Sequence, residues 1–203
     1  GKGKKTFQLM NDFGLFAPLF PATDKLLSDQ NEASNRFHSL IVSALENTDH
    51  RIQQDKPVTP AFLYAALLWP RVLIISEQYQ QQGEAGFRAL QLAGHQALDE
   101  QMPVIAIPKR FSIPMREIWT LQHRLETAHG KRAIGVLQHP RFRAAYDFLL
   151  LRLNCNYCQS INITYDQHPL IACTDLQSWG FKGLNFHWRP VSYTHLRAHE
   201  TRE

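Results

Sequence analysis

The sequence predicts an all-α protein. Apolar residues recur at helical spacing in several segments, and residues 1–153 contain no sustained two-residue alternation bounded by turn dipeptides. The hydrophobic fraction of 44% over 203 residues is sufficient for a folded core. We therefore expect helices of ordinary length joined by short connections.

Two helix starts can be read in the first half of the chain. One helix should begin near Asn31, followed by an apolar stripe of Phe37, Leu40, Ile41, Ala44 and Leu45. The next should begin at Thr59-Pro60, a capping hydroxyl followed by proline at the first helical position. Residues 61–69 are apolar on every side, which predicts the central buried helix. Because Pro70-Arg71 interrupts this run, no segment is expected to be long enough to span a bilayer.

Two further helices are predicted between residues 109 and 153. The first has Pro114 in its first turn and an apolar face of Met115, Ile118, Trp119, Gln122 and Leu125. The second starts at His139-Pro140 and buries Phe142, Ala145, Tyr146, Leu149, Leu150 and Leu153. Residues 129–132 connect them, with a glycine followed by two cations.

Positive charge is concentrated in the same region. Residues 109–152 carry nine Lys and Arg against three Asp and Glu, whereas residues 1–108 carry nine against eleven and residues 153–203 four against four. A basic face on an otherwise mildly acidic protein indicates a polyanion such as nucleic acid, or alternatively a solvated face. We divide the chain into a helical body (1–108), a basic helical region (109–153) and an irregular tail (154–203).

Targeting signals and cysteines suggest a cytoplasmic location. The basic start of the chain is not followed by the apolar stretch of a signal peptide, and Cys155, Cys158 and Cys173 all lie beyond residue 153. Together with His168, these cysteines could form a zinc site. Their spacing matches no standard zinc pattern, so we favour chance and expect no metal site, with a zinc module as the alternative.

Several segments carry a family resemblance. In chain order they are LFAPLFP (15–21), NTDHRI (47–52), VTPAFLYAALLW (58–69), IAIPKR, REIWTLQHRL, GKRA and HPRFRAAYDFLLLR. Over residues 1–153 the chain resembles the C-terminal half of bacterial poly(A) polymerases, which are class II nucleotidyltransferases related to tRNA CCA-adding enzymes. These enzymes add AMP from ATP to RNA 3′ ends with Mg²⁺. The resemblance implies a helical body domain.

The resemblance also implies a division of labour. Catalysis in the family belongs to an N-terminal head, with a Gly-Gly segment and a close pair of aspartates that hold metal ions. The only adjacent acids here are Asp99-Glu100, without a glycine-rich loop, so we expect no catalytic residue, ATP site or Mg²⁺ site in this chain and no activity when it is alone.

What carries over from the family is support for single-stranded RNA 3′ ends beside the head of the same polypeptide. The matching cations are Lys109, Arg110, Arg116, Arg124, Lys131, Arg132, Arg141 and Arg143. Trp119 and Phe142 fall on apolar faces and are not expected to stack on bases. The alternative function is a helical module whose basic face docks an acidic protein.

The tail departs from the family. After Arg152 the resemblance is expected to end, because the following residues have neither helical spacing nor basic bias. Residues 191–201 resemble a translated sequencing adapter. We therefore expect residues 154–203 to be wholly or partly frame-shifted or chimeric.

Overall fold

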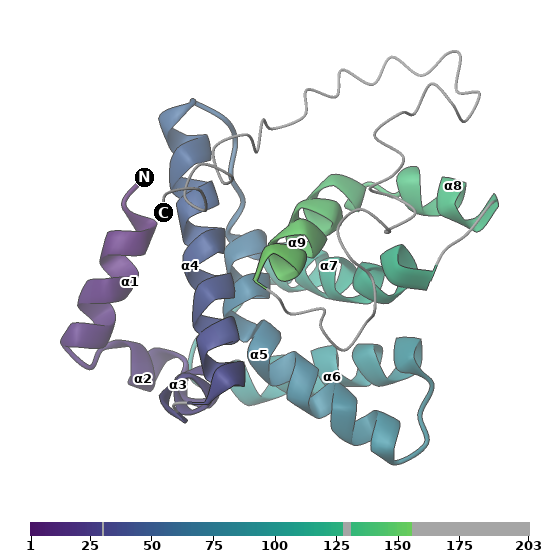
Figure 1. Cartoon of the computed structure of the whole chain (residues 1–203), viewed down its shortest axis with the longest axis horizontal. Helices are drawn as coiled ribbons and strands as arrows, with labels where there is room; N and C mark the ends of the chain where they lie inside the picture. Colours follow the sequence, from purple (N-terminus) through teal and green to yellow (C-terminus); the bar gives the residue numbers. More distant parts are fainter. Residues whose placement is uncertain (30, 128–130, 156–203) are drawn as a thin grey trace, which may run out of the picture.

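The computed structural model describes residues 1–29, 31–127 and 131–155, without the side chains of residues 131 and 132. Within these ranges the chain forms helices and no strand, which confirms the all-α prediction (Figure 1). The helices are α1 (Gly3–Asp12), α2 (Phe16–Leu19), α3 (Pro21–Ser28), α4 (Glu32–Gln53), α5 (Pro60–Gln81), α6 (Gly86–Gln101), α7 (Lys109–Thr127), α8 (Lys131–Leu137) and α9 (Phe142–Asn154).

Helix α4 begins where the sequence predicts. The Asn31 side chain accepts a hydrogen bond from the Ser34 amide at 2.8 Å and so caps the helix. The predicted stripe of Phe37, Leu40, Ile41, Ala44 and Leu45 is buried. At the other end of α4, Asp49 accepts hydrogen bonds from the amides of Gly3 and Lys4, at 2.7 and 3.1 Å. This carboxylate fastens the start of α1 to α4.

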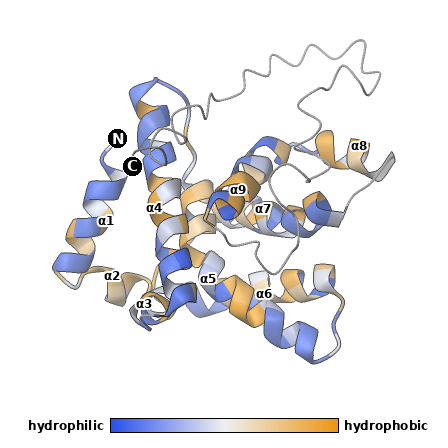
Figure 2. Cartoon of the chain, viewed as in Figure 1, coloured by the Kyte–Doolittle hydropathy of each residue, from blue (hydrophilic) through white to orange (hydrophobic). Residues whose placement is uncertain are grey.

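Helix α5 is the centre of the fold, as predicted, and it is strongly apolar (Figures 1 and 2). Thr59 accepts a hydrogen bond from the Ala61 amide at 3.2 Å, and Pro60 occupies the first turn. Helices α3, α4, α6, α7 and α9 all pack against it. The buried residues along α5 therefore hold the two halves of the described chain together.

The prediction that Pro70 interrupts this segment was wrong. Helix α5 continues through Pro70 for 22 residues. Proline removes the N–H group that would donate to the Ala66 carbonyl, four residues earlier, and its ring crowds the preceding turn. The carbonyls on either side of Ala66 accept hydrogen bonds from side chains of other helices: Ala65 O from Trp119 Nε1 at 3.0 Å, and Leu67 O from Thr23 Oγ1 at 2.8 Å. Tertiary packing thus outweighs the local cost of the proline.

This continuity also corrects the expectation about membrane-spanning length. By length and composition alone α5 could cross a membrane, with a mean hydropathy of 1.2 over its most apolar window. Half of that window is buried inside the protein. Core helices that are buried on all sides meet the same criterion. The packing of five neighbouring helices around α5 accounts for its apolar character.

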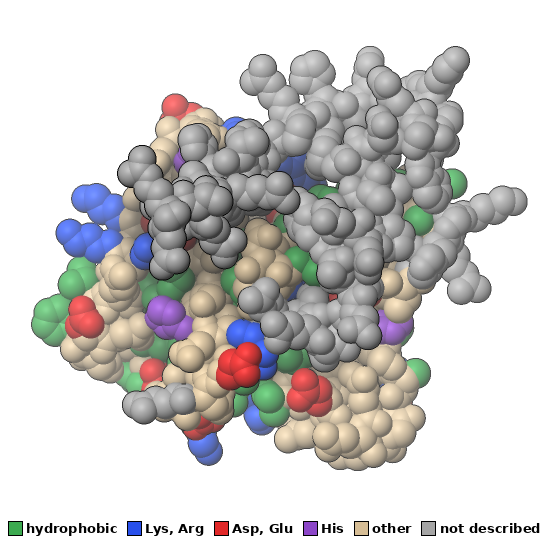
Figure 3. Space-filling model, in the orientation of Figure 1, with side chains coloured by type: hydrophobic (Ala, Val, Ile, Leu, Met, Phe, Trp, Pro, Cys, Tyr) green, Lys and Arg blue, Asp and Glu red, His purple; other side chains and the backbone are tan. Residues whose placement is uncertain are grey.

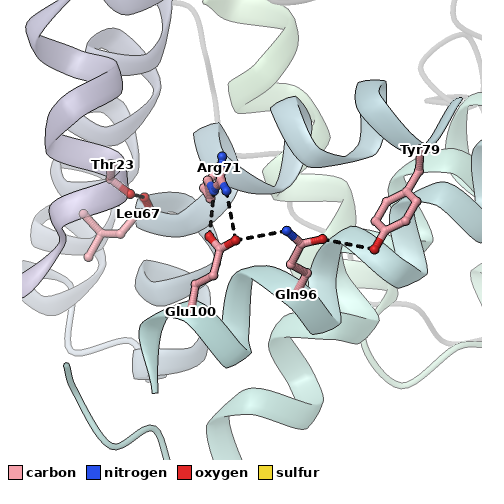
Figure 4. A network of polar contacts seen from close by, with 6 residues as sticks. All are labelled: Thr23, Leu67, Arg71, Tyr79, Gln96 and Glu100. Atoms are coloured by element: carbon pink, nitrogen blue, oxygen red, sulfur yellow. Dashed lines mark hydrogen bonds and ion pairs between the residues drawn. The ribbon is translucent and has the colours of Figure 1, made fainter. Parts of the chain in front are cut away.

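A polar network ties α5 to α6 on the outside (Figure 4). Arg71 donates to both carboxylate oxygens of Glu100, at 2.7 and 2.9 Å. Gln96 donates to Glu100 at 3.0 Å and accepts from the Tyr79 hydroxyl at 3.0 Å. The hydrogen bond from Arg71 lowers the pKa of Glu100, and the same contact raises the pKa of Arg71. The network therefore favours the ionised form of the carboxylate.

The helices of the basic region start at other residues than predicted. Helix α7 begins at Lys109, so Pro114 lies inside it and withdraws one hydrogen bond from the carbonyl of the exposed residue Arg110. Helix α9 begins at Phe142 rather than at Pro140. Helix α8 is formed by residues 131–137, of which 131 and 132 were predicted to belong to a connection and the others had no predicted structure. Buried faces rather than local helix signals set these boundaries.

Helix α7 belongs to two apolar clusters. Its residues Met115, Ile118 and Trp119 join the main core around α5. Leu121 and Leu125 join a second cluster formed with α8 and α9. The inner face of α7 is thus fixed by packing, and Lys109, Arg110, Ile113 and Arg124 on other faces are exposed among the described residues.

Candidate nucleic-acid interface

Ion pairs divide the arginines of the basic region into two groups. Each of the three acidic side chains in residues 109–152 pairs with an arginine in or immediately before α9. The N–O distances are 3.1 Å for Arg141–Glu117, 3.0 Å for Arg143–Asp147 and 2.7 Å for Arg152–Glu126. The acids of the region are therefore all occupied by these three arginines.

Arg141 and Arg143, two of the predicted RNA contacts, take part in these pairs. Arg143 contacts Asp147 one turn further along α9, whereas Arg141 links α9 to Glu117 of α7. Burial raises the pKa of Asp147 despite the nearby Arg143. The charge of both arginines is balanced locally, which makes them weaker candidates for binding phosphate than an unpaired cation.

Arg152 is a structural residue that the sequence did not single out. Its side chain is only 6% exposed, and Nη1 donates to Glu126 at 2.7 Å and to Gln122 at 3.1 Å. The guanidinium also lies 4.7 Å from the ring centre of Trp69 in α5. Arg152 is thus engaged in contacts inside the protein and is not available to a ligand.

Four predicted cations make no ion pair with any carboxylate among the described residues, and all four lie on α7. They are Lys109, Arg110, Arg116 and Arg124. Lys109, Arg116 and Arg124 follow one another at seven and eight residues, close to two helical turns each, and so share one face of the helix. Arg110 lies beside that face, 4.8 Å from the ring centre of its neighbour Phe111.

A surface groove runs along this face between α6 and α7. Its volume is about 180 Å³. The lining residues are Leu90, Gln91, Gly94 and His95 of α6, and Ile113, Arg116, Glu117, Trp119 and Thr120 of α7. Gly94 permits the close helix contact at its floor, because a Cβ atom there would lie 3.1 Å from Cε3 of the buried Trp119. A larger residue at position 94 would separate the two helices.

Beyond the groove, Arg124 lies over an aromatic side chain of α6. Its guanidinium carbon is 5.1 Å from the ring centre of Phe87, and His123 contacts the same ring edge-on at 6.1 Å. Phe87 is half-buried, and Arg88 beside it is exposed. Phe87, Arg88 and His95 are not among the residues predicted from the sequence to contact RNA. The seven-residue interval between Arg88 and His95, which places them on one helix face, was the available signal.

Some predicted residues cannot be placed. Helix α8 begins at Lys131, but the side chains of Lys131 and Arg132 lie outside the described residues. Cys158, His168, Cys173 and the adapter-like residues 191–201 also lie outside them. Their roles stay predictions.

Cys155 is the one predicted zinc ligand that can be placed. It ends α9, its Sγ lies 3.9 Å from Ser43 Oγ, and burial raises the pKa of its thiol. Within the described ranges no three His, Cys, Asp or Glu side chains come together as a metal site.

The remaining groups of interest are the lysines of α1 and the aromatic side chains of Trp119 and Phe142. On the face drawn in Figure 3, Lys and Arg side chains also gather at the edge formed by α1, which carries Lys4 and Lys5. Lys4 pairs with Glu46 of α4 at 2.5 Å. Trp119 is fully buried, and Phe142 stacks on Tyr146 with the ring centres 5.6 Å apart. Both aromatic side chains pack against neighbouring residues, and the expectation that they do not stack on bases stays a prediction.

Comparison with known proteins relates this region to a defined family. Residues 82–163 match the family described as polymerase A arginine-rich C-terminus. The chain is 39% identical over 153 residues to poly(A) polymerase I of Salmonella typhimurium, covering 75% of this chain and 32% of that protein. It is 40% identical over 153 residues, with the same coverage, to poly(A) polymerase I of Escherichia coli O157:H7. The corresponding protein of Haemophilus influenzae is 32% identical over 164 residues, covering 80% of this chain and 36% of that protein.

These matches define both the extent and the limit of the similarity. The chain spans about a third of the length of the curated relatives that it matches. The family match extends to residue 163, whereas the alignments with the Salmonella typhimurium and Escherichia coli proteins span 153 residues. The range of the family match includes Cys155 and Cys158, and the frame-shifted or chimeric origin of residues 154–203 stays a prediction.

Proposed function

Because the chain belongs to the poly(A) polymerase family through the family's C-terminal region, we propose that it holds RNA for an enzyme that adds AMP to RNA 3′ ends. The observation that carries this proposal is the set of four α7 cations without an acidic partner among the described residues. The other arginines of the region that the structure describes are occupied by its three acids. The positive charges of the basic region that have no acidic partner among the described residues therefore lie on α7, where they can attract a polyanion.

The chemistry of this surface suits single-stranded RNA held through its backbone. Lys and Arg contacts to phosphates provide affinity that depends on salt and little on sequence. An enzyme that extends any 3′ end, and then its own poly(A) product, requires RNA binding that depends little on sequence. We therefore assign to this region the support of the strand and not the choice of base.

Catalysis belongs to another part of the enzyme in this proposal. ATP and Mg²⁺ would be bound by the catalytic head of the family, for which this chain contains no carboxylate pair beside a glycine-rich loop. The chain alone should thus bind RNA without adding AMP. Its proposed role is in RNA polyadenylation, and hence in mRNA processing and decay, in the cytoplasm.

The first experiment compares two triple variants of the full chain. K109E/R110E/R124E reverses three exposed α7 cations, and K5E/K25E/K56E reverses three exposed lysines of other segments, so that both change the formal charge by −6. Binding of labelled oligo(A) is measured by anisotropy across a range of salt concentrations. We expect the α7 variant to lose most of its affinity and most of its salt dependence, and the control to lose much less.

Equal losses in the two variants would contradict an interface on α7, because they would show that only the net charge matters. Retention of binding by the folded α7 variant would contradict the proposal itself. Far-ultraviolet circular dichroism melts establish that both variants are folded. These outcomes are distinct and need no assay of AMP addition.

A second candidate function is docking of an acidic protein segment on the same surface. Ile113, which is 46% exposed, lies among the α7 cations and would give such a partner an apolar contact. A polyglutamate peptide and oligo(A) of equal charge can compete for the chain. Stronger competition by the peptide, with its loss in the variant I113S, would favour docking over RNA binding.

A further inference from the structure

Arg116 differs from the other unpaired cations in being built into the α6–α7 groove. We propose that this groove is a subsite for one phosphodiester group of the RNA, and that Arg116 is the residue that holds it. The inference rests on the proposed function and adds a location and a ligand to it. The remaining α7 cations lie on the open surface, whereas Arg116 is half-buried and lines the groove.

The hydrogen-bonding state of Arg116 points to a missing acceptor. Its Nη1 atom lies 3.2 Å from both ring nitrogens of His95, which is its only hydrogen-bond partner in the part of the chain that the structure describes. The Nε atom is buried and has no partner there. A guanidinium has five N–H donors, and a buried donor without an acceptor costs free energy. A phosphate oxygen in the groove, met by rotation of the guanidinium, would give the Nε–H group its acceptor.

The stem of Arg116 is held in place by the packing of the helices. A Cβ atom at position 94 would lie 4.0 Å from Cγ of Arg116, so the stem crosses α6 at Gly94, where the floor of the groove is closest. Trp119 fills that floor and is fixed by its hydrogen bond to Ala65 O. The guanidinium is thus presented from a rigid surface, which is the arrangement that favours bidentate phosphate contacts.

The charges around the groove favour an anion. The one acid among its lining residues, Glu117, accepts from Arg141 Nε at 3.1 Å, so its carboxylate is engaged by a second arginine. Arg116 and Arg141 together outweigh Glu117 by one positive charge. The volume of about 180 Å³ equals roughly six waters at about 30 Å³ each, enough for a phosphate group. The groove therefore has the size and the charge for one phosphate.

Its surroundings favour a nucleic-acid strand over free phosphate as the source. Arg124 lies eight residues beyond Arg116, about 12 Å along α7, and covers the ring of Phe87. An arginine plane beside an aromatic ring is a surface on which a base can stack. A strand with a phosphate at Arg116 thus passes a second contact point, which inorganic phosphate cannot use.

The test uses single substitutions in the full chain and labelled oligo(A). R116Q should weaken binding about tenfold or more and reduce the slope of log affinity against log salt by about 0.7, the value for one phosphate contact of a single strand. E117Q should bind as well as the unchanged chain or better. The matched control is R36Q, the same chemical change in α4, where Arg36 pairs with Glu32. It should change affinity by less than about twofold.

A direct readout is the NMR signal of the Arg116 Nε–H group. Oligo(A) should shift it at concentrations that saturate binding, and inorganic phosphate should do so only far more weakly. If R116Q unfolds the protein, R116K provides the same comparison. Lysine keeps the positive charge but lacks the planar set of guanidinium N–H donors, so affinity for oligo(A) should still be reduced.

Affinity of R116Q equal to that of R36Q, with an unshifted Nε signal, would overturn the subsite. If the K109E/R110E/R124E variant still loses binding in that case, the proposed function stands and only the groove assignment falls. An equal shift with inorganic phosphate and with oligo(A) would overturn the assignment to a nucleic-acid strand.

Discussion

Replacing Arg152 with methionine should destabilise the protein by roughly 3 kcal/mol, although the residue lies in a region whose other cations we assign to RNA. Arg152 and Glu126 are 6% and 17% exposed, and their closest N–O distance is 2.7 Å. The substitution keeps a long apolar side chain over Trp69 but leaves the Glu126 carboxylate without its partner. Removing one member of a buried pair costs about 3–5 kcal/mol, and the slight exposure of Glu126 favours the lower end.

Urea unfolding of the full chain, followed by circular dichroism, measures this cost. A loss of roughly 3 kcal/mol corresponds to a fall in Tm of roughly 6–12 °C for a domain of this size. The double variant R152M/E126L should be far less destabilised than the sum of the two single variants, because it leaves no unpaired charge. Folded R152M should still bind oligo(A) within about twofold of the unchanged chain.

Three results would refute this reasoning. A cost below about 1 kcal/mol for R152M would mean that the pair behaves as a surface ion pair. Additive costs in the double variant would mean that the two side chains do not interact. A tenfold loss of oligo(A) binding by folded R152M would instead place Arg152 at the RNA.

Three further predictions concern the body. T23V should lower the free energy of unfolding in urea by about 1–2 kcal/mol, because the Leu67 carbonyl loses the hydroxyl that donates to it at 2.8 Å. The control is T6V, the same change at an exposed site, and an equal loss there would contradict the prediction. Since the pKa of Glu100 is lowered in the folded state by Arg71, its stabilisation is present above its ordinary pKa and is lost as pH falls through the folded value. In E100Q the free energy of unfolding should no longer show this decrease at low pH, which is at most about 1 kcal/mol for so exposed a pair. An unchanged dependence of the unfolding free energy on pH would disprove the stabilising role of the Arg71–Glu100 pair. G94V should lower Tm by several degrees, because its side chain would overlap the buried indole, and an unchanged melt would show that α6 and α7 can separate freely.

Local sequence signals predicted the helices that begin with a good cap. Asn31 and Thr59 act as caps where expected, because a side-chain acceptor at a helix start works within a few residues. The two prolines within helices contradict the predicted helix boundaries. Pro70 and Pro114 each lie inside a helix, and both of these helices pack against several others. Such packing cannot be read from a local window.

The candidate site was predictable in composition but not in its internal order. The excess of cations and the helical period of α7 are visible in the sequence. Which arginines are neutralised depends on how α7 and α9 face one another, since Arg141 pairs with Glu117 and Arg152 with Glu126 across helices. Only Arg143–Asp147, an i,i+4 pair, could be anticipated from spacing.

The hydrogen bond from Trp119 to Ala65 fastens the inside of the proposed interface to the middle of α5. Amides of this part of α7 should therefore exchange with solvent among the slowest in the protein, even before any ligand is present. A strand that binds the opposite face would meet a backbone that is already ordered. Binding would then cost conformational entropy mainly in the RNA and in a few side chains, so that affinity is governed by ion release and by the stiffness of the RNA.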